Sequence, residues 1–381
     1  MSWDVIVVGT GGMGSAAVLE LARRGRRVLG LDRYGPAHAL GSSHGGSRIY
    51  RQSYLEDPAY VPLLLRAWDR WHRLVADSGT DVFVPTGGLY AGPAGGPTFA
   101  GSLRSAEQWD LPHEVLDAAG VARRFPTFRL APGELALVEQ RAGYARPEAT
   151  VAAQLRLAAA AGAELRFDEP VESWQPGPPA RVRTAAGTYE AGALVLTAGA
   201  WTPELAGLDL PMVVERQVMH WVAPAGPIAP YERNPVFICG DGPDQVYGFP
   251  AIDGPAGGVK VSFFRAGEPT TPQTVDRTVR PAEVAALRRR AAEVLPGLTG
   301  PAVAATVCLY TTTPDEHFVI GPHPAYGNVV VAGGFSGHGF KFVPEIGRLL
   351  ARLAKGEPGP GDPFRLGPGR RAGTLGPSGH R

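Results

Sequence analysis

The first 32 residues alternate between fully apolar and amphipathic segments. Residues 4–9 (DVIVVG) place a run of apolar residues after a single acid, which is typical of a strand buried in a parallel sheet. Residues 15–24 (SAAVLELARR) have the apolar spacing of an amphipathic helix that ends near Gly25. Residues 26–32 (RRVLGLD) predict a second strand. The three segments together predict one β-α-β unit of about 30 residues.

Similar segments return later in the chain. Residues 147–162 predict an Ala/Leu helix with a proline in its first turn and a glycine at its end. Residues 163–167 predict a short strand, and residues 180–192 alternate like a hairpin around a glycine. Two further buried strands run into glycine turns, at residues 193–201 and 328–339, and an amphipathic helix follows the second.

The segments between these have a different texture. Residues 82–140 and 212–304 are rich in proline, glycine, aromatics and short β-like runs, which favours a second, mainly antiparallel domain threaded through the first. We therefore expect an α/β fold (α+β overall): a Rossmann-like domain from residues 1–81, 141–211 and 305–356, with an interleaved antiparallel β-sheet domain that binds the substrate. Residues 357–381 lack the apolar content to pack and predict a loose tail.

Composition narrows the class of protein. The chain has 381 residues, 44% of them hydrophobic, and a formal net charge of +1, so no electrostatic feature favours nucleic acid or an anionic membrane as partner. No stretch approaches the roughly 20 apolar residues of a membrane span, and the N-terminus lacks the basic region of a signal peptide. Two cysteines, Cys239 and Cys308, are too few for a disulfide framework, so we expect a cytoplasmic protein. No histidine pair has metal-ligand spacing, and no metal site is expected.

Three glycines form a nucleotide-binding pattern. Gly9, Gly11 and Gly14 make G-x-G-x-x-G between the first strand and the first helix. In that context the glycines allow a tight turn, close approach of a pyrophosphate and close packing of helix on strand. Asp32 ends the second strand, where a carboxylate accepts hydrogen bonds from a ribose diol and disfavours the 2′-phosphate of NADP. The motif leaves FAD and NAD open, but the two later glycine turns favour FAD, because a longer cofactor would use all of them.

Three more segments carry a resemblance to a known family. They are residues 41–63 (GSSHGGSRIYRQSYLEDPAYVPL), 307–318 (VCLYTTTPDEHF) and 334–342 (GFSGHGFKF). With the N-terminal motif, they make the chain resemble the monomeric sarcosine oxidase and N-methyltryptophan oxidase family, within the glycine/D-amino-acid oxidase superfamily of FAD enzymes. The resemblance covers roughly residues 1–355. It implies a flavin bonded through its 8α-methyl group to a cysteine, and Cys308 stands at the matching position; a small buried core cysteine is the alternative.

The resemblance also implies a set of site residues. Arg51 and Lys341 match a pair that binds the substrate carboxylate, and a bidentate Arg suits that task. Arg48 matches an arginine lying against the flavin ring, and Lys260 one that promotes reaction with oxygen. Glu56 matches an acid near the mouth of the site, although a surface carboxylate is an equal alternative. The remaining candidates are residues lining the pocket or flanking the ring, namely His44, His338, Tyr247 and Tyr310, and cofactor-binding residues, namely Arg33, Ser42, Gly334, Gly337 and Gly339, with Lys341 in both groups.

The chain departs from the family at several positions. Ser43-His44 stands where His-His is common, and Gly46 where an acid is common. Phe264 stands where the family has a histidine four residues after the lysine, which would make the substrate pocket more apolar. We therefore expect a monomeric FAD oxidase that acts on a small secondary (N-methyl) amino acid and O2, giving an imine and H2O2. A bulkier or cyclic substrate, a flavin dehydrogenase with a partner acceptor, an NAD-linked dehydrogenase and a non-catalytic dinucleotide-binding protein are the alternatives.

Overall fold

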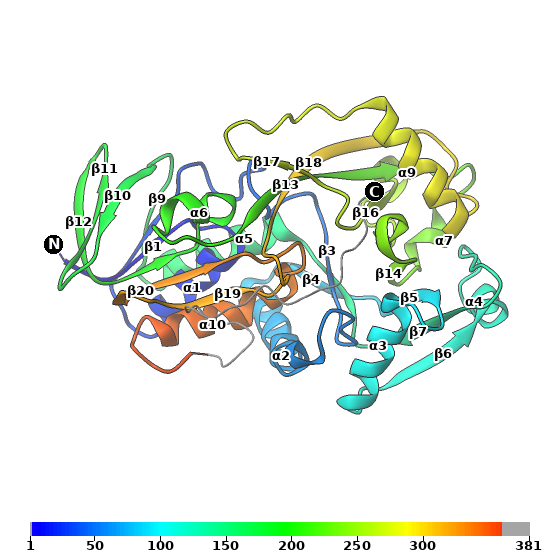
Figure 1. Ribbon diagram of the computed structural model, residues 1–381, viewed down its shortest axis with the longest axis horizontal. Helices are drawn as coiled ribbons and strands as arrows, with labels where there is room; N and C mark the ends of the chain where they lie inside the picture. The colour runs from blue at the N-terminus through cyan, green and yellow to red at the C-terminus, as the bar shows by residue number, and fades with distance from the viewer. Residues whose placement is uncertain (1, 360–381) are drawn as a thin grey trace.

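The strands are divided between two large sheets and one small sheet (Figure 1). The computed structural model describes residues 2–359. The first sheet has the order β10 (Val171–Gln175), β11 (Ala180–Thr184), β12 (Gly187–Leu196), β1 (Ser2–Val8), β2 (Val28–Leu31) and β9 (Glu164–Arg166), with β20 (Tyr326–Gly333) beside β12 and β19 (Val319–His323) beside β20.

The second sheet lies at the other end of the molecule in Figure 1. Its order is β17 (Glu268–Thr270), β13 (Val213–Val222), β16 (Val259–Phe263), β15 (Val246–Gly248), β14 (Val236–Cys239), β5 (Gly88–Pro93), β7 (Glu134–Glu139) and β6 (His113–Asp117), with β18 (Ala302–Thr312) paired to β13. The small sheet contains β3 (Arg48–Tyr50), β8 (Gly143–Ala145) and β4 (Phe83–Pro85).

The helices surround these sheets. The α-helices are α1 (Gly12–Arg23), α2 (Val61–Ser78), α3 (Pro97–Gln108), α4 (Ala118–Arg124), α5 (Pro147–Ala160), α6 (Thr202–Leu205), α7 (Ala229–Glu232), α8 (Gly254–Gly257), α9 (Pro281–Val294) and α10 (Val343–Leu353). Short 3-10 turns are η1 (Pro58–Tyr60), η2 (Gly199–Trp201), η3 (Gly242–Asp244) and η4 (Phe340–Phe342). No described helix is long and apolar enough to cross a bilayer.

The first sheet confirms the predicted β-α-β unit and the α/β class. β1 pairs in parallel with both β2 and β12, and β12 pairs in parallel with β20. The continuous apolar run of β1 follows from this central position, because residues on both of its faces are covered: Val7 faces one core cluster and Ile6 the other. Parallel strands end at the same edge of a sheet, so their following loops meet there.

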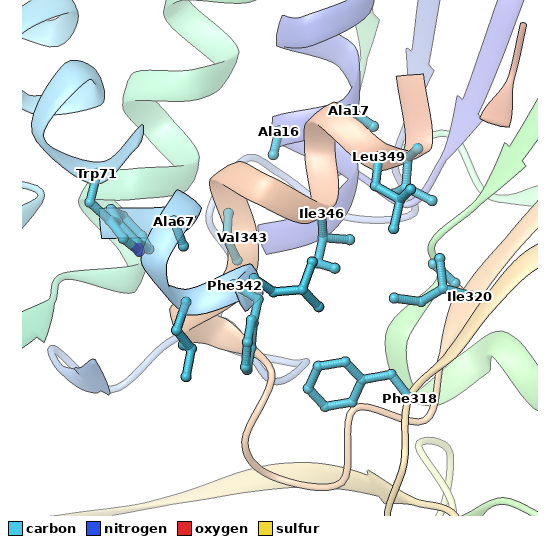
Figure 2. Packing of buried hydrophobic residues seen from close by; sticks show 14 of the residues in the cluster. Ala16, Ala17, Ala67, Trp71, Phe318, Ile320, Phe342, Val343, Ile346 and Leu349 are labelled. Atoms are coloured by element: carbon cyan, nitrogen blue, oxygen red, sulfur yellow. The ribbon is translucent and has the colours of Figure 1, made fainter. Parts of the chain in front are cut away.

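Helices α1 and α10 bring the two ends of the described chain together. Figure 2 shows Ile346 and Leu349 of α10 beside Ala16 and Ala17 of α1. The approach is close because small residues face each other: a Cβ added to Gly347 would lie 2.5 Å from the Ala16 Cβ. The glycine loop before α1 and the glycine loop before α10 are therefore held side by side.

The second sheet is antiparallel except where β5 and β14 run in parallel. Its longest pairing joins β13 to β18 from Val213–Thr312 to Val222–Ala302, and this pairing places Cys308 opposite Gln217. Helix α9 covers the sheet through Leu287 and Ala291. The division of the chain into two interleaved domains stays a prediction. The predicted loose tail falls almost wholly on residues 360–381, outside the residues that the structure describes.

Candidate active site

A cavity of about 350 Å³ lies at the carboxyl ends of the parallel strands. It is bounded by the loops that follow β1, β2, β12 and β20; the loop after β2 is the one that leads into β3. Eight of the predicted cofactor-binding residues line it: Gly9, Gly11, Asp32, Arg33, Ser42, Gly334, Gly337 and Gly339. The separate glycine turns of the sequence thus form one elongated site.

Gly9 and Gly14 are required by packing. Gly9 has φ +85°, and a Cβ there would lie 2.6 Å from the carbonyl oxygen of Thr197. Gly14 does not line the cavity; it is a glycine because a Cβ would lie 1.8 Å from the Gly9 carbonyl oxygen, where helix and strand touch. The third glycine of the motif therefore serves helix–strand packing, as predicted.

Asp32 lies at the end of β2 with its carboxylate already ordered. One oxygen accepts hydrogen bonds from the Thr10 backbone N–H at 2.7 Å and from the Thr10 hydroxyl at 2.9 Å. The other accepts from the Tyr34 N–H at 3.1 Å and lies 3.6 Å from His38 Nε2. This acid is fixed in the wall of the cavity, at the position where a ribose diol would donate to it.

Cys308 lies behind the wall of the same cavity, on β18. The thiol is buried, and Arg48 Nη2 lies 3.4 Å from Sγ. Arg48 lines the cavity and donates to the Ser42 carbonyl at 2.9 Å, while Ser42 Oγ donates to the Leu309 carbonyl at 2.7 Å. These contacts tie the loop after β2 to β18, so the predicted attachment cysteine and the arginine predicted to lie against the ring are neighbours.

Lys260 is buried next to this group, on β16. Its Nζ donates to the Gly45 carbonyl at 2.6 Å and the Ser47 carbonyl at 2.9 Å, and it lies over the rings of Trp221 and Phe249. Burial first, and then the charge of Arg48, lower the pKa of Lys260 well below its ordinary value. Lys260 is therefore not a solvent-exposed lysine on a strand edge.

Arg51 and Lys341 meet around one aromatic ring, although they come from opposite ends of the chain. The Arg51 guanidinium lies 4.4 Å and the Lys341 ammonium 5.2 Å from the Tyr54 ring centroid. Burial, and then Arg51, lower the pKa of Lys341 to about 7. Glu56 is buried and accepts a 2.5 Å hydrogen bond from Arg51 Nη2. Although burial alone would raise the Glu56 pKa, the charge of Arg51 holds it below its ordinary value.

The predicted histidines are uncharged groups in this site. Burial, followed by Arg48 and Lys260, lowers the pKa of His44 to about 3. His338 shares a hydrogen bond with the Tyr54 hydroxyl through Nδ1, and its Nε2 lies 3.0 Å from the Glu316 carbonyl. Burial lowers its pKa well below the ordinary value. Both rings are therefore neutral; His338 is held by its two hydrogen bonds, whereas His44 Nε2 is buried without a hydrogen-bond partner among the described residues.

The two predicted tyrosines and Phe264 supply aromatic rings to the site. Tyr310 lines the cavity and packs on Gly337, whose added Cβ would lie 2.3 Å from the Tyr310 ring. Burial raises the pKa of both Tyr247 and Tyr310, so both phenols stay protonated. Phe264 is buried with its ring centroid 6.2 Å from that of Tyr247. A buried apolar ring thus occupies this position.

Three residues next to the site carried no sequence signal. Tyr54 contacts both cations and His338. Arg265 pairs with Glu316 at 2.5 Å and lies 3.9 Å from Glu56. Glu148 accepts hydrogen bonds from the loop that holds Lys260. Tyr54 lies within residues 41–63 but was not singled out there, whereas Arg265 and Glu148 lie outside the three segments, and only tertiary contacts reveal their part in the site.

The residues present fit FAD. One cavity is lined by the glycine turn after β1, a carboxylate for the ribose, Tyr310 and Arg48, and the Cys308 sulfur lies 3.4 Å from Arg48 Nη2. Residues 2–359 contain no group of three or more His, Cys, Asp and Glu side chains that could hold a metal ion.

Known proteins are similar to this chain in sequence and in fold. The family model described as FAD dependent oxidoreductase matches residues 4–353. A monomeric sarcosine oxidase of Streptomyces avermitilis is 53% identical over 359 residues, 93% of this chain and 94% of the relative. An N-methyl-L-tryptophan oxidase of Salmonella heidelberg is 35% identical over 378 residues, 96% and 99% of the two chains. The solved structure of NikD, described as an unusual amino acid oxidase essential for nikkomycin biosynthesis, superposes with a TM-score of 0.80 and 27% identity, covering 93% of this chain and 94% of that one.

Proposed function

The chain belongs to the FAD-dependent oxidoreductase family, and from that premise we propose that it is an oxidase of secondary N-methyl amino acids of the sarcosine oxidase type. The meeting of Arg51 and Lys341 around Tyr54, beside the cavity, is the observation that carries this proposal. Two cations from distant parts of the chain converge in a buried place, and an amino-acid carboxylate is the anion that fits them. The active form is a monomer in this proposal, as in the name of the 53% identical relative.

The chemistry that FAD would supply when bound is the two-electron oxidation of the amine to an imine, with a hydride equivalent lost from the carbon next to nitrogen, and the reduction of O2 to H2O2. Gly9, Gly11 and Asp32 would hold its pyrophosphate and ribose, with Arg33, Ser42, Gly334, Gly337 and Gly339 along the rest of the cavity. We assign the covalent bond to the Cys308 sulfur. Arg48, 3.4 Å from that sulfur, supplies positive charge beside the attachment point.

The chain's own residues orient the substrate and exclude water. Arg51 and Lys341 bind the carboxylate, Tyr54 lies between them, and His338 holds the Tyr54 hydroxyl. Glu56 pairs with Arg51 and balances one of the two positive charges. The product imine is hydrolysed by water, which for an N-methyl substrate releases formaldehyde and the demethylated amino acid.

Lys260 serves the oxygen half of the reaction in this proposal. Its ammonium is fixed by two carbonyls and stabilises negative charge that develops on oxygen. This role favours an oxidase over a dehydrogenase that passes electrons to a partner protein. Aerobic turnover that yields one H2O2 per substrate supports the oxidase; turnover only with an added electron acceptor supports the dehydrogenase.

Phe264 favours a second candidate substrate class. Its ring is buried beside Tyr247, and in this proposal it forms an apolar part of the substrate pocket. A bulkier or cyclic secondary amino acid, such as an N-methyltryptophan, pipecolate or proline, would gain contact area there. A peroxidase-coupled assay with sarcosine and these substrates ranks them by kcat/KM, and peroxide formation with none of them would overturn the proposed function.

Cys308 gives a direct test of the cofactor and its attachment. After acid precipitation, the flavin is expected to stay with the wild-type protein and to remain in the supernatant for Cys308→Ser, as measured by absorbance and mass. Cys239→Ser is the matched control, because Cys239 is the other cysteine of the chain and is buried in the core of the second sheet. Flavin retained by Cys308→Ser would contradict the assignment.

A further inference from the structure

The loop at residues 45–47 is bound on one side by a carboxylate. Glu148, in the first turn of α5, accepts a hydrogen bond from the Gly45 N–H to Oε1 at 2.5 Å. Both of its oxygens lie 3.2 Å from the Gly46 nitrogen and accept that N–H. Glu148 is more than 100 residues away from this loop in the sequence. In the sequence alone it looks like an ordinary glutamate in the first turn of a helix.

The same loop is bound on its other side by Lys260. The ammonium donates to the carbonyls of Gly45 and Ser47 at 2.6 and 2.9 Å. The Gly45 carbonyl and the Gly46 N–H belong to one peptide group. That single peptide group therefore lies between a carboxylate and an ammonium, and each charge polarises it in the direction that strengthens the other hydrogen bond.

The backbone of the loop is shaped for this arrangement. Gly45 has φ +92° and Gly46 φ +75°, so their consecutive N–H groups can both point at one anion. Met219 closes the space over Gly45, since a Cβ there would lie 2.4 Å from the Met219 Cε. The carbonyls that hold Lys260 consequently have little freedom to turn away.

Glu148 is also the carboxylate whose negative charge acts on Lys260. The charged or ionisable groups that act on the lysine are Arg48 of β3, Cys308 of β18 and Glu148 of α5, with His44 neutral on the same loop. Arg48 opposes the ammonium form, and the Glu148 carboxylate favours it. Burial, the largest effect on the Lys260 pKa, works against the charge as well, so the carboxylate offsets these two unfavourable effects in part.

We propose that Glu148 is a positioning residue for the oxygen half of the reaction: through the Gly45–Gly46 peptide group it keeps the Lys260 ammonium charged and in place. The inference rests on the proposed function, because it takes Lys260 as the group that assists oxygen. It assigns Glu148 no contact with the substrate, so the oxidation of the substrate should not depend on it.

The scarcity of lysine makes the proposal measurable. The chain has only three lysines, Lys260, Lys341 and Lys355. Protein labelled with 13C at lysine Cε therefore gives three side-chain signals, which Lys→Arg variants assign. The pH dependence of the Lys260 signal reports the pKa of its ammonium without any turnover.

In Glu148→Gln, which keeps the shape and loses the charge, the Lys260 pKa is expected to fall by about one unit, the size of effect that a nearby opposite charge produces. Reoxidation of the reduced enzyme by O2 should slow by about tenfold at a pH above that pKa. Anaerobic reduction by substrate should stay within about twofold of wild type. Glu148→Asp keeps the charge and should lie between the two in both measurements.

Glu283→Gln is the matched control. Glu283 also lies in the first turn of a 14-residue helix that begins with proline, and it pairs with Arg216 away from the 45–47 loop. It should leave the Lys260 pKa and reoxidation unchanged. An unchanged Lys260 pKa in Glu148→Gln, equal slowing of both half-reactions, or equal slowing in Glu283→Gln would overturn the proposal. If Glu148→Gln does not fold, Glu148→Asp decides, since an unchanged Lys260 pKa there also overturns it.

Failure of the proposed function would look different. Wild-type enzyme whose reduced flavin does not react with O2 would overturn the oxidase. The effect of Glu148 on the Lys260 pKa would still be measured, and a fall in that pKa with no oxygen reaction in wild type would locate the error in the role of the lysine.

Discussion

At the scale of single residues, lysine is rare in this chain and concentrated in the candidate site. Of its 37 basic residues only three are lysines, and two of these are buried in the candidate site. A compact ammonium fits between two carbonyls, as at Lys260, and it can lose its proton when buried, which a guanidinium cannot. The third, Lys355, is exposed next to α10.

Lys341 should make anion binding depend on pH. Its pKa is lowered to about 7 by burial and Arg51, while Glu56 opposes the shift and Arg265 adds to it. The protonated form attracts a carboxylate, so binding is strong below pH 7 and weakens as the pH rises through the pKa. The Kd of acetate, an anion with no amine of its own, should rise up to about tenfold per pH unit above 7. Flavin absorbance during titration measures it.

Lys341→Arg separates this effect from other titrations. Arginine stays charged at every accessible pH, so the variant should bind acetate with little change between pH 6 and about 9. Lys355→Met, at the exposed lysine, should keep the wild-type pH profile. An equal pH slope in wild type and Lys341→Arg would show that another group controls binding.

At the scale of secondary-structure elements, the contact between α1 and α10 aligns two loops of the cavity. Gly347→Ala tests it. Alanine favours a helix over glycine by about 1 kcal/mol, yet its Cβ would lie 2.5 Å from the Ala16 Cβ. We expect the clash to dominate and to lower the free energy of unfolding by about 1–3 kcal/mol in a denaturant titration.

Gly226→Ala is the control for that substitution, because nothing lies within 4 Å of a Cβ built there. It should change the free energy of unfolding by less than about 0.5 kcal/mol. If Gly347→Ala were as stable as wild type, α1 and α10 would have to separate without cost, and the close approach would not be what aligns the two glycine loops.

Helices and strands that are marked by a local sequence pattern could be predicted. The distant strands with which they pair could not. The unit β1–α1–β2 follows from apolar runs and glycines within 32 residues. The pairing of β13 with β18 joins segments about 90 residues apart, and no feature of either strand specifies the other. Strand β18 is also mostly exposed or half-buried at its start, so its alternation is weak there.

The candidate site divides in the same way. Arg51, Lys260 and Lys341 were found through motifs, and the structure buries all three. The surface alternative for Glu56 is wrong, because its carboxylate is buried against Arg51. Glu148 and Arg265 were missed because each reaches the site from an unremarkable helix start or loop, where only the folded chain supplies the partner.

At the scale of the whole molecule, a buried carboxylate joins the N-terminal and C-terminal parts of the fold. Glu345 of α10 is fully buried and pairs with Arg66 and Arg70 of α2 at 2.7 and 2.8 Å, and with Arg348 at 2.7 Å. The α2–α10 contact also orders η4, since Trp71 Nε1 donates to the Lys341 carbonyl at 2.8 Å. Lys341 is thus anchored to an element 270 residues away.

Glu345→Gln should therefore weaken the whole fold. Leaving three arginines without their carboxylate is expected to lower the free energy of unfolding by about 3 kcal/mol at pH 7.

Burial alone would raise the Glu345 pKa, but hydrogen bonds from Arg348 and Arg66 lower it below its ordinary value. A carboxyl group whose pKa is lower in the folded than in the unfolded state stabilises the fold at any pH above the unfolded-state pKa. This contribution is lost as the pH falls through the folded-state pKa. The difference between wild type and Glu345→Gln in denaturant titrations should accordingly narrow in acid. Glu164→Gln, which breaks a surface pair with Arg166, should cost less than about 1 kcal/mol. An equal cost in the two variants would mean that the Glu345 cluster adds no more to stability than a surface ion pair.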